Sequence, residues 1–465
     1  MAVRIRFLGG VGTVTGSSHL ITTDKSQVLL DAGLFQGRRD ESYSINTSFQ
    51  FNPRKLDALI LSHAHIDHCG NIPTLIKRGM RCRIYSTSAT RDLAKLMLED
   101  SGKIQEEDTR YVNKINRRLG LPLREALYTR KEALKVGSRF RAIPYGTRFC
   151  AAKDIFFTFF DAGHILGSSV IAVEIKEAEG KSVMLGYAVD LGRKNLPLLN
   201  DPVVPKGLDY LVLESTYGGR LHAPIGEAKE KLKEAVNRTI ARKGKILIPA
   251  FTLERTQEII FFLDELLKEK SIAPVPIYVD SPLALEITDL FSHHADYLDS
   301  ETSRNMSRKE GPFESLSLRF IRTQEESKGL NNDKRPMIII AGSGMCESGR
   351  ILHHLKNNIE ESRNSILVVG YMAKDTLGRK IVERSRFVRI FGVEHELNAE
   401  VIVINSFSGH ADKNELCDFA LAASPLKRVF LVHSDPEQAQ ALSDALNEKN
   451  IKNYIPSKRE EILLS

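Results

Sequence analysis

The 465-residue sequence has no apolar stretch near the roughly 20 residues that a membrane-spanning helix requires. It also lacks any CxxC pair, internal repeat or low-complexity tract, and no signal peptide is predicted at its start. The five cysteines are odd in number and scattered: Cys69, Cys82, Cys150, Cys346 and Cys417. This pattern is more typical of a reducing cytoplasm than of a disulfide framework. We therefore expect a cytoplasmic protein with no membrane partner.

Length and charge add two expectations. A chain of this length predicts two or three domains, each with its own core. The net charge is +7, and the segment 102–148 alone holds 12 lysines and arginines against 5 acidic residues. Such a segment is either a solvated helical face or a surface that contacts nucleic acid, and the sequence leaves both interpretations open.

One stretch carries a dense group of metal-ligand side chains. The apolar run 56–61 predicts a short buried strand, and His63-Ala-His65-Ile-Asp67-His68 follows directly after it. Imidazole and carboxylate groups suit a catalytic zinc ion. Burying four such groups without partners would cost several kcal/mol, so a metal centre explains them better than a structural role.

The same order, a predicted strand followed by a ligand-type side chain, recurs at both ends of the chain. It places Asp31, His164, Asp190 and Glu214 after strands in the first half, and His410 and His433 near the end. Residues 215–390 instead alternate strands with long helices, which is typical of a parallel sheet. We expect a domain at 1–214, an inserted domain at 215–390, and completion of the first domain by 391–465.

These motifs resemble those of a known family. The His63–His68 motif, with Asp31, His164 and Asp190, resembles the metallo-β-lactamase signature. Glu214, the stretch Ser408-Gly409-His410-Ala411-Asp412 and His433 resemble motifs A, B and C of its β-CASP nuclease branch. Ile248-Pro249-Ala250-Phe251, Gly342-Ser343-Gly344-Met345 and the stretch from Gly370-Tyr371 to Gly378-Arg379 also match. The resemblance implies an α/β fold: a metallo-β-lactamase αββα sandwich with an inserted α/β β-CASP domain on a parallel sheet.

The resemblance also implies a centre with two Zn²⁺ ions per chain. His63, His65 and His164 would hold one ion, and Asp67, His68 and His433 the other, with Asp190 between them. Asp31 would orient a ligand through a hydrogen bond. His410 would be the general acid, because histidine titrates near neutral pH. Glu214 would orient either His410 or His433. The residues predicted to take part in catalysis are therefore His410 and Glu214, together with Asp67 and Asp31.

His433 favours RNA, since members of this family that act on DNA generally lack the motif C histidine. One departure is Ser434, which stands where glycine is usual and leaves the loop geometry there less certain. The chain is most similar to stand-alone bacterial members that resemble the endonuclease subunit of the cleavage and polyadenylation machinery. We therefore expect endonucleolytic hydrolysis of single-stranded RNA, in RNA processing or decay, that leaves a 5′-phosphate and a 3′-hydroxyl.

Three alternatives stay open at this stage. The chain could be a 5′→3′ exoribonuclease of RNase J type, a DNA or small-molecule hydrolase on the same two-zinc site, or an inactive RNA-binding scaffold. Candidate RNA contacts are Ser408, Ser343, Gly344, Arg350 and Lys380, for which surface or packing roles are equally open. A homodimer is also possible.

Overall fold

The computed structural model describes residues 2–177, 180–370, 372–373 and 376–464. The chain forms two compact units: residues 1–194, 200–221 and 409–465 make the first, and residues 195–199 and 222–408 make the second. Tyr371, part of one supporting stretch in the sequence, lies outside the described residues. None of the described helices is long and apolar enough to cross a membrane.

The first unit is a sandwich of two mixed seven-stranded sheets. One sheet has the order β22-β1-β2-β3-β4-β5-β6, and its strands are Glu461–Leu464, Val3–Gly9, Ser18–Thr22, Gln27–Leu30, Ala58–Ile60, Arg83–Ser86 and Phe140–Ala142. The other has the order β21-β20-β11-β10-β9-β8-β7, with strands Asn453–Tyr454, Arg428–Val432, Tyr210–Glu214, Ser182–Ala188, Ser169–Lys176, Ile155–Asp161 and Phe149–Ala152. Alternate apolar side chains of both sheets, among them Phe7 and Phe157, meet in one core.

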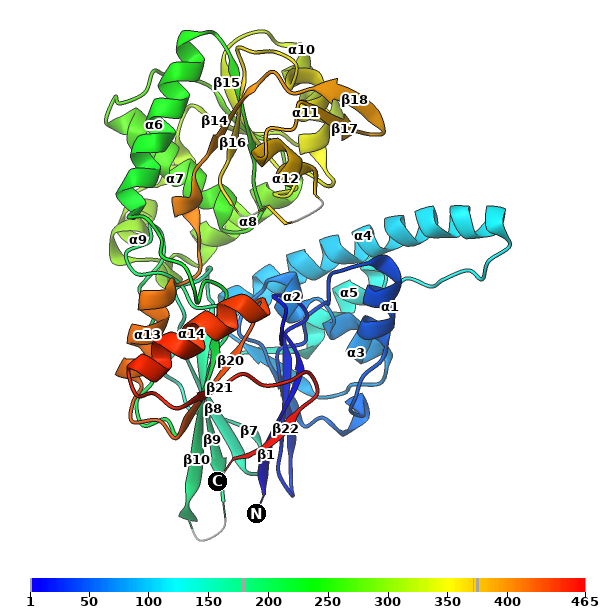
Figure 1. Cartoon of the computed structure of the whole chain (residues 1–465), viewed down its shortest axis with the longest axis vertical. Coiled ribbons are helices and arrows are strands. Elements are labelled where there is room, and N and C mark those ends of the chain that lie inside the picture. Colours follow the sequence, from blue (N-terminus) through cyan, green and yellow to red (C-terminus); the bar gives the residue numbers. More distant parts are fainter. Residues whose placement is uncertain (1, 178–179, 371, 374–375, 465) are drawn as a thin grey trace. The chain divides into compact units, whose positions relative to one another are not determined.

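Helices cover the outer faces of this sandwich (Figure 1). On one side, Phe419 and Leu442 of α13 (Lys413–Ala422) and α14 (Pro436–Glu448) pack in a core with β11 and β20. The other helices of this unit are α1 (Arg39–Thr47), α2 (Ile66–Cys69), α3 (Ile72–Lys77), α4 (Ser88–Leu119) and α5 (Arg130–Val136). The αββα sandwich predicted from the resemblance is confirmed.

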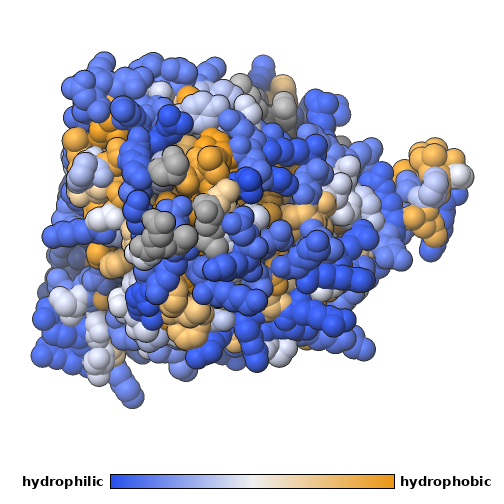
Figure 2. All heavy atoms as spheres, turned by 90° about the horizontal axis from the view of Figure 1, so that it is seen from below, coloured by the Kyte–Doolittle hydropathy of each residue, from blue (hydrophilic) through white to orange (hydrophobic). Residues whose placement is uncertain are grey.

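Helix α4 is longer than the sequence indicated. The sequence pattern predicts helices at 88–99 and 103–135, but residues 88–119 form one 32-residue helix, which Gly120 ends in a left-handed conformation with φ of 67°. Residues 120–129 are not helical, and α5 begins only at Arg130, so the prediction for this part was wrong. The far end of α4 projects from the unit, and its tip is hydrophobic on the face seen in Figure 2. Leu119, Leu121 and Leu123 are 65%, 52% and 54% exposed there. Part of the basic segment 102–148 therefore lies on this projecting helix.

The second unit contains one six-stranded parallel sheet in the order β14-β13-β15-β12-β16-β19. Its strands are Leu318–Phe320, Ile277–Val279, Met337–Ala341, Lys245–Pro249, Ser365–Val368 and Glu400–Val403. Its helices are α6 (Ile225–Ala241), α7 (Arg255–Lys268), α8 (Pro282–His293), α9 (Ser300–Ser307), α10 (Gln324–Asn332), α11 (Arg350–Asn358) and α12 (Leu377–Val382), and a hairpin joins β17 (Phe387–Ile390) to β18 (Val393–Glu396). Apolar runs such as 337–341 are buried on both faces, as a parallel sheet requires.

The two units change over at residues 221/222 and 408/409, whereas the sequence placed the domain boundaries at 214/215 and 390/391. The second difference has a clear physical cause. Strand β19 pairs in parallel with β16, so Glu400–Val403 completes the sheet of the second unit before the chain returns to the first.

Candidate metal centre

The predicted ligand side chains gather at one edge of the sandwich, where strands of both sheets end. Asp31 follows β3, His63 follows β4, His164 follows β8, Asp190 follows β10, and His433 follows β20. Asp31, Asp190 and His433 have φ values of 57°, 64° and 59°. Such left-handed backbone costs non-glycine residues roughly 1–3 kcal/mol each and is concentrated at functional sites. It turns each side chain away from the strand direction and into the cluster.

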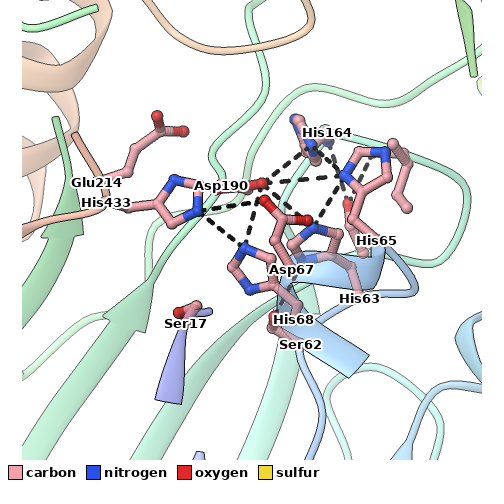
Figure 3. A network of polar contacts seen from close by, with 12 residues as sticks. Ser17, Ser62, His63, His65, Asp67, His68, His164, Asp190, Glu214 and His433 are labelled. Atoms are coloured by element: carbon pink, nitrogen blue, oxygen red, sulfur yellow. Dashed lines mark hydrogen bonds and ion pairs between the residues drawn. The ribbon is translucent and has the colours of Figure 1, made fainter. Parts of the chain in front are cut away.

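Two groups of ligand atoms result, and both lie in the first unit. His63, His65, His164 and Asp190 form one group, in which all ligand atoms lie within 4.8 Å of one another. Asp67, His68 and His433 form the other. Asp190 joins the two, because one of its carboxylate oxygens lies 3.2 Å from His63 Nε2 and 3.5 Å from His68 Nε2, while the other lies 3.0 Å from His433 Nδ1 (Figure 3).

The donor chemistry fits cations. His65 Nδ1 lies 3.1 Å from His63 Nε2 and 3.2 Å from His164 Nε2, so three imidazole nitrogens converge. Burial lowers the pKa of His63 to about 4 and holds the pKa of His164 well below its usual value. Both rings are therefore neutral at pH 7 and direct lone pairs toward their neighbours. Converging neutral imidazoles and a carboxylate are the usual ligands of a catalytic zinc ion.

Charge distribution separates the second group from the first. Burial works against ionisation of His433, yet Asp190 and Asp67 together raise its pKa to about 9. Burial opposes the charge on Asp190 as well, but nearby His433, His68 and His410 hold its pKa well below the usual range. The two carboxylates and the nearby histidines thus stabilise one another's charges.

A buried network fixes the orientation of His68. Asp31 accepts hydrogen bonds from the Ser62 amide and hydroxyl at 2.7 Å each and from Tyr187 Oη at 3.0 Å. The remaining contact joins Asp31 to His68 Nδ1 at 2.7 Å, so that Nε2 faces the cluster. Tyr187 also lies 3.1 Å from Ser17 Oγ and 3.3 Å from His19 Nδ1. Asp31 has the position predicted for it, but Tyr187 and Ser62 carry no local sequence signal and were missed.

Close backbone approach holds the metal-binding loop in place. A Cβ on Gly33 would lie 1.6 Å from the carbonyl oxygen of Asp67, so only glycine fits there. The Ser17 amide donates to that same carbonyl at 2.8 Å, and the His433 amide donates to the carbonyl of Gly10 at 2.6 Å. The segment 10–17 is therefore packed directly against the cluster.

The predicted catalytic pair forms a third group beside Asp190. His410 Nδ1 lies 3.1 Å and 3.2 Å from the two carboxylate oxygens of Glu214, which is completely buried. Glu214 also accepts a hydrogen bond from the backbone amide of Leu191. Burial works against a charged His410, but Glu214 and Asp190 raise its pKa above the ordinary value. Of the two histidines that the sequence left open, Glu214 contacts His410.

Only part of this cluster is accessible from outside. The side chains of His65, Asp67 and His410 are 29%, 26% and 22% exposed, whereas the other members are at most 3% exposed. A substrate can therefore contact a member of each ligand group and His410. The three accessible side chains mark the entrance of the site.

The five predicted RNA contacts belong to the second unit, and one of them, Ser408, lies two residues before His410 in the sequence. Arg350 is paired with the buried Asp280 and donates to the carbonyl oxygens of Ile321 and Arg322. Ser343 Oγ accepts hydrogen bonds from the amides of Glu347 and Ser348. A Cβ on Gly344 would lie 2.8 Å from the ring of Phe251, so close packing accounts for this glycine. Lys380 is exposed and Ser408 half-buried, and an RNA contact at these five residues stays a prediction.

Fold and site together define a metal-dependent hydrolase of the αββα type. Residues 11–129 match the metallo-β-lactamase superfamily, residues 256–381 match the Beta-Casp domain, and residues 394–456 match the Zn-dependent metallo-hydrolase RNA specificity domain. The chain belongs to the β-CASP ribonuclease branch of the metallo-β-lactamase superfamily.

Relatives agree with this assignment over nearly the whole chain. The chain is 36% identical to Ribonuclease TTHA0252 of Thermus thermophilus, over 96% of each protein. It is 33% identical to Transcription termination factor FttA of Pyrococcus horikoshii, over 99% of this chain and 71% of that protein. A solved structure from Enterococcus faecalis, described as a protein of unknown function, shares the fold with a TM-score of 0.57 at 13% identity and full coverage of both chains.

Proposed function

We propose that the protein is a two-zinc endoribonuclease that cleaves single-stranded RNA internally and leaves a 5′-phosphate and a 3′-hydroxyl. The observation that carries this proposal is the joint arrangement of the ligand groups and His410. Two groups of neutral or paired ligands share Asp190, and a partly exposed histidine, held by a buried glutamate, stands beside them. The RNA specificity domain at 394–456 contains both His410 and His433 and supports RNA as the substrate.

The proposed ligands follow the two groups. His63, His65 and His164 would hold one zinc ion, Asp67, His68 and His433 the other, and Asp190 would lie between both. Bound zinc would supply a hydroxide at neutral pH and neutralise negative charge on the phosphate. Asp31, fixed by Ser62 and Tyr187, would keep His68 in the tautomer whose Nε2 is free to bind metal.

His410 would complete the reaction as general acid. Cleavage to a 3′-hydroxyl breaks the bond from phosphorus to the 3′-oxygen, and that oxygen needs a proton. His410 is partly accessible, and Glu214 and Asp190 raise its pKa above the ordinary value, which favours the protonated ring. Glu214 contacts Nδ1, so the proton for the leaving oxygen would come from Nε2. Donation from a positioned side chain typically accelerates such reactions by about 10²–10⁴-fold.

The proposal is tested by cleavage of one RNA labelled at either end, with single-stranded DNA and a chelator lane as controls. Internal RNA products that disappear with chelator are expected. Exclusively terminal mononucleotides would instead indicate an exoribonuclease, and cleavage of DNA at a similar rate would contradict RNA specificity. RNA bound and left intact by the zinc-loaded protein would indicate a scaffold.

A metal assay on variants separates the proposed roles. His410→Ala should keep both zinc ions while cleavage falls by about 10²–10⁴-fold, because His410 transfers a proton and does not bind metal. His433→Ala should lose the second ion. His293→Ala, on the exposed end of α8, is the matched control and should change neither property. Loss of a zinc ion in His410→Ala would overturn the assignment of the general acid.

A further inference from the structure

A small pocket lies directly beside the metal-binding loop, entirely within the first unit. Its walls come from the segment 8–18, the stretch 45–51 and the turn at Lys458 and Arg459, together with Phe35 and Asn71. The segment 10–17 and the metal loop share hydrogen bonds, from Ser17 to Asp67 and from His433 to Gly10. Figure 3 shows Ser17 close to His68 and Ser62. A group bound in this pocket therefore lies next to the proposed reaction centre.

The pocket has the chemistry of a single-stranded nucleic-acid contact. Three half-buried phenylalanines, Phe35, Phe49 and Phe51, line it, and Lys458 lies over the ring of Phe35 at 5.3 Å. Lys458 and Arg459 are exposed cations, and no carboxylate lines this pocket. Aromatic faces that stack on bases, combined with cations that attract phosphates, are the shared features of proteins that bind single strands.

A second observation points to a polar ligand. Asn71 is only 6% exposed and lines the pocket, and its side-chain amide group donates to the carbonyl of Asn46 at 3.2 Å. Its Oδ1 has no hydrogen-bond partner among the residues that the structure describes. An unpaired buried acceptor costs about 1–3 kcal/mol. This oxygen has almost no exposed area, so the N–H of a nucleobase could pair with it only after the neighbouring side chains shift.

We propose that this pocket is a nucleobase subsite for an RNA nucleotide close to the cleaved phosphate. The inference rests on the proposed ribonuclease function and adds where a base of the substrate is held. The cavity measures about 70 Å³ and is open on one side. It is smaller than the roughly 150 Å³ cavity that encloses benzene, so only one edge of a base enters. The face of the base stacks on phenylalanine, and the adjoining phosphate meets Lys458 or Arg459.

The test asks whether the effect of removing one base on KM depends on the side chain of Phe49. Wild-type protein and Phe49→Leu are assayed for kcat and KM on a set of RNAs that each carry one abasic nucleotide at a successive position around the cleavage site. At one position, removal of the base should raise the wild-type KM by about fivefold, the lower end for one stacked base, and leave kcat unchanged. Phe49→Leu should show the same rise on intact RNA and no further rise at that position.

A matched control separates this effect from damage to the fold. Phe156→Leu alters another half-buried phenylalanine, at the start of β8 and therefore distant from the strand ends that bear the ligands. It should leave KM unchanged. Equal KM changes at every abasic position, or the same single-position penalty in Phe49→Leu as in wild type, would overturn the subsite.

Exposed cations supply a second readout in case Phe49→Leu is unstable. Lys458→Gln should reduce the slope of log binding constant against log salt by about 0.7, measured by fluorescence anisotropy in chelator. Arg428→Gln should not, although Arg428 also lies over an aromatic ring, that of Tyr454 at 6.0 Å, at the opposite end of β20 from His433. Equal salt slopes for wild type and Lys458→Gln would contradict the subsite. If wild type cleaves no RNA at all, the proposed function fails, whereas cleavage without coupling refutes the subsite alone.

Discussion

The pKa of each titratable side chain at the site depends on its burial and on the charges beside it. Burial lowers the pKa of His63 and His164, whereas neighbouring carboxylates raise the pKa of His433 and His410. His433 would release its proton on binding zinc, while His410, which binds no metal in this assignment, would keep its proton for the leaving oxygen. Asp161, three residues before His164, shows the same dependence on surroundings outside the ligand set. Burial raises its pKa to about 6, even though the Gly163 amide donates to it at 2.9 Å.

This shift predicts how stability depends on pH. The folded pKa of Asp161, about 6, exceeds the unfolded value of about 3.9, so the folded state binds the proton more strongly. Stability contributed by this group is present below about pH 4 and lost as pH rises through 6. Asp161→Asn cannot ionise and should raise the free energy of unfolding at pH 7.5 by about 1–3 kcal/mol, after allowance for partial exposure.

At about pH 2.5 the gain should disappear, because Asp161 is then largely neutral in both the folded and the unfolded state. Denaturant unfolding at the two pH values checks this, with Asp24→Asn in an exposed turn as the control. A gain of equal size at both pH values would show that the substitution acts through packing and not through charge.

Among the elements, the junction of α4 with α5 depends on one glycine inside a helix. Gly102 lies within α4, where a glycine ordinarily costs about 1 kcal/mol relative to alanine. A Cβ there would lie 2.9 Å from backbone atoms of Arg130, which begins α5. Gly102 therefore lowers the intrinsic stability of α4 but allows α4 and α5 to pack closely.

Gly102→Ala should therefore lower the melting temperature, despite the higher helix propensity of alanine. Gly329→Ala is the matched control, because Gly329 lies within α10 and nothing approaches its Cβ position within 4 Å. The free energy of unfolding of Gly329→Ala should rise by up to about 1 kcal/mol. Calorimetry of both variants measures the difference, and a stabilised Gly102→Ala would mean that α5 moves aside without cost.

For the whole molecule, the proposed zinc ions and the fold of the first unit support each other. Without cations, the buried ligand groups face one another with only partial compensation from protons. Zinc at 1,000 times its dissociation constant would stabilise the bound state by about 4 kcal/mol. Removing zinc with a chelator should lower the unfolding temperature of the first unit and increase hydrogen exchange in β4, β10 and β20.

The sheet of the second unit provides the internal control. Strands β12, β15 and β16 contain no member of these ligand groups, so their exchange should not respond to the chelator. Readdition of zinc should restore the first unit. A chelator effect of equal size in both units would indicate general destabilisation and not loss of a local ion.

Local sequence determined the strands and the residues that follow them. The sequence pattern predicts strands over 27–30 and 182–188, which are the bounds of β3 and β10, and Asp31 and Asp190 follow them in the chain. Alternation of apolar residues and a ligand at each strand end are properties of short stretches, so they can be read without knowledge of the fold. The resemblance of seven ordered motifs supplied the αββα class, which the structure confirms.

Only tertiary structure decided which partners meet across long distances in the chain. Tyr187 contacts Asp31 across 156 positions, and His410 contacts Glu214 across 196, because parallel and antiparallel pairing brings their strand ends to one edge. The pairing of β19 with β16 moves the second change of unit to 408/409, and the pocket beside the metal loop combines residues 8–18 with 458–459. The sequence determined the ligand types from local pattern; sheet pairing decided their neighbours, and with them the burial and charge that set each pKa.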